Sequence, residues 1–204
     1  MKKSKFIAHA APVKSNEEAE EFIKKEWEQY PDATHIVYGY IVGKETGQIF
    51  RRLSDNGEPQ GTSGPPVYDV LDKGEIWDTV ITVTRYYGGT LLGTGGLVKA
   101  YGSSASGVVR EAGLVQMVPG RFMEVYTPYK FIDSFNYQLG LISEQVNVLE
   151  HEYLADVKIS VIVDIAYEAE FYQLVSELTQ GQGFVEEGEL RYQAKDITEK
   201  EIEE

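Results

Sequence analysis

Two kinds of hydrophobic spacing alternate along the first 113 residues. Apolar side chains three and four positions apart predict a helix that begins after Ser15, where Glu18 completes a capping box, and ends before Pro31. The same spacing predicts a helix over 95–111, closed by Gly113. Runs of β-branched and aromatic residues between turn residues predict strands. We expect strands at 5–13, 34–43, 48–53 and 76–86, and a short helix from Pro65 to Leu71.

The residues from 114 onward follow a second regular pattern. We expect strands at 121–127, 144–151, 157–165 and 184–193, and helices at 129–139 and 168–179. This β-α-β-β-α-β order is that of a ferredoxin-like domain. The sequence therefore predicts an α+β protein with two domains, 1–113 and 114–204, whose boundary falls near 113–118.

Charge divides between the same two regions. Residues 1–113 hold 13 Lys and Arg against 15 Asp and Glu, whereas residues 114–204 hold 6 against 18. Fifteen of the 20 glycines also precede residue 114. The first region is therefore the one suited to an anion or a nucleic acid, and the acidic second region is suited to a basic protein partner.

Composition excludes several kinds of site. The chain contains no cysteine, which excludes disulfides, thiolate zinc sites, iron–sulfur clusters and a cysteine nucleophile. The three histidines, His9, His35 and His151, lack metal-ligand spacing, so we expect no metal and no cofactor. No signal peptide or membrane-spanning run is visible, which favours a cytoplasmic protein without a membrane partner. The oligomeric state is left open.

The densest chemical signal is the glycine-rich stretch RYYGGTLLGTGGLVKAYGSS at 85–104. A strand is expected to end at Arg85 and a helix to begin near Gly95, and free amides at a helix start attract anions. The segment between Thr79 and Arg110 has no acidic residue. Candidate anion-binding residues here are Arg85, Gly88, Gly89, Gly93, Thr94, Gly95, Gly96, Lys99 and Arg110. The alternative, that the glycines only permit tight turns and close helix packing, stays open.

A second signal is the turn-rich loop DNGEPQGTSGPP at 55–66. Its candidate ligand-binding residues are Asp55, Glu58, Gly61, Thr62 and Ser63. Two carboxylates in one loop could act as acid and base or hold magnesium, but an Asn-Gly turn with proline punctuation is favoured over catalysis. We expect strand 76–86 to pair near strand 48–53, so that both loops leave adjacent strand ends and form one site.

Known phosphate and catalytic motifs are incomplete. Gly88 and Gly93 have the spacing of the P-loop, but Thr94 stands where lysine is required. Gly93 and Gly95 begin a dinucleotide-binding pattern that Val98 interrupts. No nucleophile elbow is present. We therefore assign no catalytic residue and favour a binding protein over an enzyme.

The two loops taken together closely resemble the signature of the IMPACT family, with the core Arg85-Tyr86-Tyr87-Gly88-Gly89 as its specific part. The two-domain length resembles the bacterial, YigZ-type members. The resemblance implies that residues 1–112 have the α/β fold of the second domain of a small-subunit ribosomal protein, a fold shared with GHMP kinases and elongation factor G. It further implies that residues 120–196 have the ferredoxin-like fold of the last domain of that factor.

The resemblance also sets expectations about function. Eukaryotic IMPACT proteins act in translational control by competing for an activator of a stress kinase. They carry an extra N-terminal module that we do not expect in this sequence, so that partner is not carried over. We expect a regulator associated with translation that binds RNA, the ribosome or a protein through its N-terminal domain, with Arg51 and Arg52 adding phosphate contacts. The alternative is an enzyme or binding protein for a phosphorylated small molecule that uses the glycine-rich loop.

Overall fold

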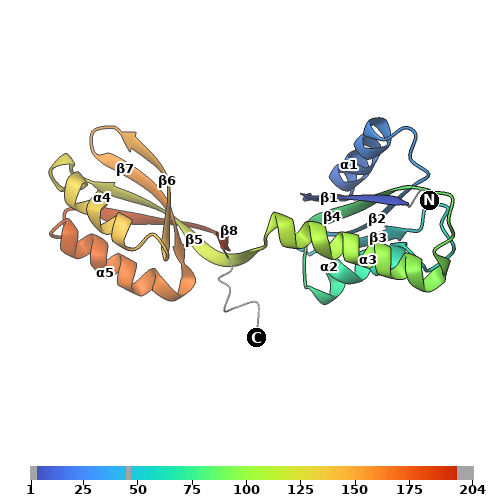
Figure 1. Cartoon of the computed structure of the whole chain (residues 1–204). Coiled ribbons are helices and arrows are strands. Elements are labelled where there is room, and N and C mark those ends of the chain that lie inside the picture. Colours follow the sequence, from blue (N-terminus) through green and yellow to red (C-terminus); the bar gives the residue numbers. More distant parts are fainter. Residues whose placement is uncertain (1–3, 45–46, 197–204) are drawn as a thin grey trace. The chain divides into compact units, whose positions relative to one another are not determined.

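The computed structural model describes residues 4–44 and 47–196, which form two compact units that divide between Leu114 and Val115. Each unit contains a four-stranded antiparallel sheet (Figure 1). The α+β class and the ferredoxin-like order of the second unit are confirmed. No helix of the described part is long and apolar enough to cross a membrane.

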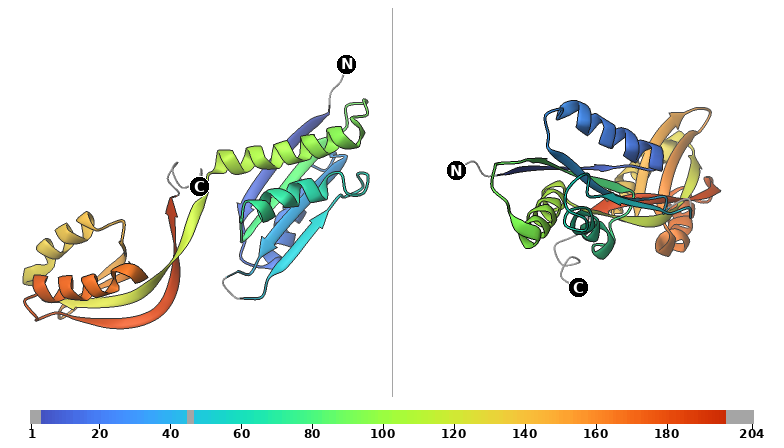
Figure 2. Two further views of the ribbon diagram at one scale, coloured as in Figure 1. Left: turned by 90° about the horizontal axis from the view of Figure 1, so that it is seen from below. Right: turned by 90° about the vertical axis from the view of Figure 1, so that its right-hand side faces the viewer.

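The first unit is a sheet with helices on both faces. Its strands are β1 (Lys5–Pro12), β2 (His35–Val42), β3 (Phe50–Ser54) and β4 (Thr79–Tyr86), in the order β1-β4-β2-β3. Its helices are α1 (Asn16–Gln29), α2 (Gly64–Lys73) and α3 (Gly93–Ala112). Figure 2 shows α1 on one face of this sheet and α2 with α3 on the other.

The faces of β4 determine which helix packs on which side. Alternate β4 residues such as Ile81 and Val83 are buried against α2 and α3 in the larger core. Val80 points the other way, into a smaller core under α1. On that side the buried carboxylate of Glu26 accepts hydrogen bonds from the Thr82 hydroxyl and approaches His9 Nδ1 at 2.9 Å, which fixes α1 to the sheet.

The expected start of α1 is confirmed in detail. The Ser15 hydroxyl accepts the Glu18 N–H at 3.2 Å, and the Glu18 carboxylate reaches back to the N–H of Lys14 at 2.7 Å. The first bond satisfies a free amide of the first helical turn, and the second binds the amide of Lys14, one residue before the Ser15 amide that a capping box would bind.

The expected pairing of strand 76–86 near strand 48–53 is wrong. β4 pairs with β1 and β2, and β2 lies between β4 and β3. Because β3 and β4 both run antiparallel to β2, they are parallel to each other and end at the same edge of the sheet. The two loops therefore still leave the sheet at one end.

The second unit covers one face of its sheet with two helices. The strands β5 (Val115–Thr127), β6 (Val146–Tyr153), β7 (Val157–Asp164) and β8 (Phe184–Asp196) lie in the order β6-β7-β5-β8. The helices are α4 (Ile132–Leu141) and α5 (Glu168–Leu178), each preceded by a short 3₁₀ turn, at Tyr129–Phe131 and Ile165–Tyr167. Phe135 of α4 and Phe171 of α5 are fully buried against β5 and β7.

The first strand of this unit is longer than predicted. The sequence predicts a strand from residue 121, but β5 begins at Val115 and pairs with β8 from Val115 to Tyr126, with a register shift between Arg121 and Met123. The added part of the strand contains Pro119, and proline lacks the N–H that an inner strand needs. The pairing with β7 begins only at Gly120, so Pro119 has a described strand on one side alone, and the strand accommodates it.

Candidate ligand-binding site

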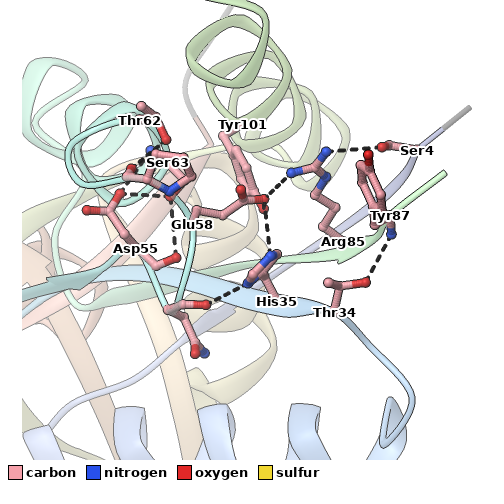
Figure 3. Close-up of polar contacts among 12 residues, drawn as sticks. Ser4, Thr34, His35, Asp55, Glu58, Thr62, Ser63, Arg85, Tyr87 and Tyr101 are labelled. Carbon is pink, nitrogen blue, oxygen red and sulfur yellow. Dashed lines mark hydrogen bonds and ion pairs between the residues drawn. The ribbon is translucent and has the colours of Figure 1, made fainter. Parts of the chain in front are cut away.

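The loop after β3 is organised around Asp55. Its carboxylate accepts hydrogen bonds from the backbone N–H groups of Gly61, Ser63 and Gly64 at 2.8–3.0 Å, and from the Ser63 hydroxyl at 2.7 Å (Figure 3). Burial alone would raise the pKa of Asp55, but these hydrogen bonds together lower it below its ordinary value. Asp55 therefore folds the loop and caps the start of α2.

The same loop requires glycine at two positions, and its Thr62 and Ser63 hydroxyls form hydrogen bonds within the loop. Thr62 donates its hydroxyl to the carbonyl of Pro59 at 2.6 Å. A Cβ added to Gly64 would lie 2.9 Å from the carbonyl carbon of Ser54, and Gly57 adopts a positive φ of 84° beside His35. The Asp55, Thr62 and Ser63 side chains are thus engaged in the structure of the loop itself.

Glu58 and Arg85 join the two loops through a buried ion pair. The Arg85 guanidinium donates to a carboxylate oxygen of Glu58, and the two side chains are 5% and 3% exposed. The Tyr101 hydroxyl of α3 donates to the same oxygen at 2.8 Å. Burial, followed by this bond to Glu58, raises the pKa of Tyr101 far above its ordinary value.

Further contacts hold the Arg85 guanidinium in place. Its other terminal nitrogen donates to the Ser4 hydroxyl at 3.2 Å, and that hydroxyl also accepts the N–H of Gly88 at 3.3 Å. The guanidinium lies over the rings of Phe6 and Tyr87, at 5.5 and 5.4 Å from their centroids. Its buried Nε has no hydrogen-bond partner among the described residues.

His35 lies beside the Glu58–Arg85 ion pair. Its Nδ1 donates to the carbonyl of Asn56 at 2.8 Å, and its Nε2 lies 3.9 Å from the Glu58 carboxylate. The hydrogen bond to a carbonyl assigns the ring proton to Nδ1 when the imidazole is neutral.

The glycine-rich loop leads directly into α3, which begins at Gly93, two residues earlier than predicted. Gly93, Thr94, Gly95 and Gly96 therefore form its first turn rather than a preceding loop. No side chain caps this turn and it contains no acidic residue. The first backbone N–H groups of the helix are left available to an anion.

Beside this helix start lies a cavity of about 560 Å³. It is lined by Ser4 and Phe6 near β1, Thr90 and Leu92 of the loop, and Gly96, Lys99, Ala100 and Ser103 of α3. The lining contains one cation and no carboxylate. Lys99 is exposed and forms no ion pair with any described residue. A volume of this size is typical of small-ligand sites.

The structure brings some of the predicted residues to this cavity and leaves others elsewhere. Gly96 and Lys99 line it, and Arg85 approaches it through Ser4. Arg110 is eleven residues beyond Lys99 on α3, about 16 Å along the axis, so it belongs to the other end of the helix. Arg52 pairs with Glu20 of α1, and Arg51 lies over the Trp77 ring.

Sequence reasoning missed Ser4, Phe6, His35 and Tyr101 as parts of this region. Tyr101 occupies an apolar-face position of α3, and helical spacing alone does not reveal that its hydroxyl reaches Glu58. Ser4 and Phe6 become neighbours of the loop only because β1 pairs with β4.

The sequence that forms these loops matches a known protein family. A model of the Impact N-terminal domain matches residues 2–109. The IMPACT family member YvyE of Bacillus subtilis (strain 168) is 35% identical over 197 residues, which cover 97% of this chain and 89% of that protein. The chain belongs to the IMPACT family. The resemblance inferred from the two loops is therefore confirmed.

Other IMPACT relatives extend the comparison. IMPACT family member YigZ of Escherichia coli (strain K12) is 31% identical over 89% of this chain and 88% of that protein. A Protein IMPACT homolog of Dictyostelium discoideum is 35% identical over 94 residues, 45% of this chain and only 27% of that protein. A solved structure titled as that of a hypothetical protein is 30% identical, covers 93% of this chain and 91% of its own, and superposes with a TM-score of 0.53.

Proposed function

We propose that the N-terminal unit binds single-stranded RNA and that the protein acts as a regulator associated with translation. In this proposal the open first turn of α3 and Lys99 hold a phosphate, and the adjoining cavity takes the attached nucleoside. The observation that carries it is the combination of a cavity without carboxylates, an uncapped helix start and an unpaired lysine at one place. The translational role that the family resemblance implies agrees with this chemistry.

The division of labour among the signature residues supports a binding role. Asp55 and Glu58 are occupied in folding the loops, which leaves the helix start and Lys99 facing the cavity as the groups available to a ligand. Phe6 contributes an aromatic ring to the lining, and aromatic rings stack on unpaired bases. The acidic second unit disfavours RNA, so the interaction belongs to the first unit.

A titration of the full chain with a fluorescently labelled single-stranded RNA tests the proposal. Lys99→Ala is compared with Lys24→Ala, which removes the same charge from α1 on the opposite face of the sheet. We expect Lys99→Ala to weaken binding by about 10- to 100-fold, the value of a charge-assisted hydrogen bond. The slope of log affinity against log salt should fall by about 0.7, which corresponds to one lost phosphate contact on a single strand.

The control and the alternatives separate the possible results. Lys24→Ala should bind like the wild type, and all three proteins should unfold at the same urea concentration. Equal affinities for the two variants would remove Lys99 from the site. Binding of mononucleotides without binding of RNA would instead support the phosphorylated small molecule, which a cavity of about 560 Å³ can accommodate.

A further inference from the structure

The second unit contains a groove at the edge of its sheet, apart from the site described above. A cavity of about 360 Å³ lies between α4 and β6. Its lining comprises Asn136, Leu139 and Gly140 of α4, Ser143 of the following turn, and Val146, Asn147, Val148 and His151 of β6. At one point His151 Nε2 and the Asn136 side-chain oxygen are 2.9 Å apart.

β6 presents a free backbone edge beside this groove. Among the described strands it pairs with β7 alone, so the amides and carbonyls along its other side have no partner strand. A bulge between Val148 and Glu150 changes the pairing to β7 in the middle of the strand. A bulge reduces pairing at the point where it lies, and the unpaired backbone groups on either side of it are able to accept an additional strand.

Large apolar side chains surround the groove and are exposed to solvent. Tyr137 and Leu141, one turn apart on α4, are 67% and 63% exposed. Tyr153 at the end of β6 and Leu154 after it are 64% and 59% exposed. Several exposed apolar residues around one groove mark an interaction surface more often than a bare solvent face.

The chain segment that forms the groove is acidic, while Lys195 of β8 donates to the carbonyl of Glu144 in the turn after α4. From Ile132 to Val157, through α4 and β6, the chain has five carboxylates and no Lys or Arg. The Glu152 carboxylate is paired with Lys158 of β7. Glu150 is exposed and forms no ion pair or hydrogen bond with any described residue.

We propose that the groove and the free edge of β6 bind an extended segment of a partner protein in which basic and apolar residues alternate. The segment adds as a fifth strand, with its apolar side chains in the cavity and over Leu139 and Val148. Its Lys or Arg side chains face the solvent-exposed carboxylates, Glu150 among them. A second copy of this edge would bring like charges together, so a basic partner is favoured over self-association.

The test uses the full chain and three synthetic ten-residue peptides that alternate Lys with Val, Leu or Phe. Matched peptides carry Glu in place of Lys, and a further set has the same composition with all Lys residues in one block. Binding is measured by fluorescence anisotropy, and hydrogen exchange then locates the protected amides. We expect at least one Lys peptide to bind, the Glu and block peptides to bind at least tenfold more weakly, and new protection to fall within 146–153.

Two variants and their controls assign the binding to this groove. A Cβ at Gly140 meets no heavy atom within 4 Å, so Gly140→Leu fills the groove without disturbing the helix. It should weaken the peptide at least tenfold, whereas Gly107→Leu on α3, which is equally open, should have no effect. Glu150→Gln should weaken binding several-fold at low salt, and Glu170→Gln on α5 should not.

Three results would overturn the proposal. The first is failure of all three Lys peptides to bind. The second is binding that Gly140→Leu leaves unchanged, or protection that appears outside β6. The third is a dimer in sedimentation that Gly140→Leu dissociates, because this would assign the groove to a second copy of the chain.

Discussion

Removal of the Glu58 carboxylate should destabilise the first unit strongly, because it leaves the Arg85 charge buried without a counter-ion. Both side chains are at least 95% buried, and the Nε of Arg85 has no partner among the described residues even in the intact protein. Loss of one partner from a buried ion pair costs about 3–5 kcal/mol. With a urea m-value of roughly 2 kcal/mol/M, Glu58→Leu should lower the unfolding midpoint by about 2 M.

The second perturbation tests whether the buried charge itself is the cause. Replacement of both partners by apolar residues removes the unpaired charge, so Glu58→Leu combined with Arg85→Met should be more stable than Glu58→Leu alone. The double variant should still fall short of the wild type, since the Tyr101 hydroxyl loses its acceptor. Asp69→Leu, at an exposed ion pair with Lys73 on α2, serves as the control and should leave the midpoint almost unchanged.

Tryptophan fluorescence isolates the relevant transition. The two tryptophans of the chain, Trp27 and Trp77, both lie in the first unit, so their emission reports on its unfolding and not on that of the second unit. If the double variant loses as much free energy of unfolding as Glu58→Leu and Arg85→Met lose together as single variants, the reasoning is refuted. Such a result would mean that solvent, rather than the partner side chain, stabilises each charge.

Two further predictions concern the loop and the second sheet. The pKa of Asp55 is lowered in the folded state, so its contribution to stability is present above the ordinary carboxyl pKa of about 4 and is lost as the pH falls through the lower folded value. The urea midpoint of the wild type should therefore fall more steeply below about pH 4 than that of Asp55→Asn. Parallel curves of urea midpoint against pH for the two proteins would contradict this. Gly120→Ala would place a Cβ 2.5 Å from Ile162 Cγ2 and 3.0 Å from the Val163 carbonyl oxygen. Thermal unfolding of the second unit, followed by circular dichroism, should therefore shift to lower temperature. An unchanged transition would show that β5 and β7 can move apart at this point without loss of stability.

Local patterns were sufficient for the elements but not for their arrangement. The spacing of apolar residues and the Ser15–Glu18 box determine where α1 begins, because a helix start is satisfied by neighbours in sequence. The position of β4 between β1 and β2 depends on pairings between residues 38 to 81 positions apart, which no local spacing encodes. The mistaken pairing with strand 48–53 arose from this difference.

The sequence predicted which residues belong to the candidate site, but not which of them hold the loops in place and which are available to a ligand. Asp55, Glu58 and Arg85 have the residue types of a ligand site, and nothing in the sequence distinguishes a carboxylate that binds a ligand from one that binds backbone amides. The distinction depends on Ser63 and Gly64 folding back onto Asp55, and on Tyr101, 43 residues further along the chain, reaching Glu58. Lys99 differs from Arg85 only because no carboxylate lies within its reach among the described residues.

The two units use their carboxylates differently, in line with the different partners proposed for them. In the first unit the acidic residues of loop 55–66 have partners within the unit: Asp55 accepts hydrogen bonds from backbone amides, and Glu58 forms an ion pair with Arg85. The surface they leave behind, around Lys99, has an excess of positive character although the unit is close to neutral. In the second unit the carboxylates near β6 include that of Glu150, which is exposed and has no ion-pair or hydrogen-bond partner among the described side chains. Its negative charge therefore lies uncompensated at the surface. Net charge alone distinguishes a nearly neutral unit from an acidic one, whereas the positions of the paired and unpaired charges indicate where on each unit a charged partner would be attracted.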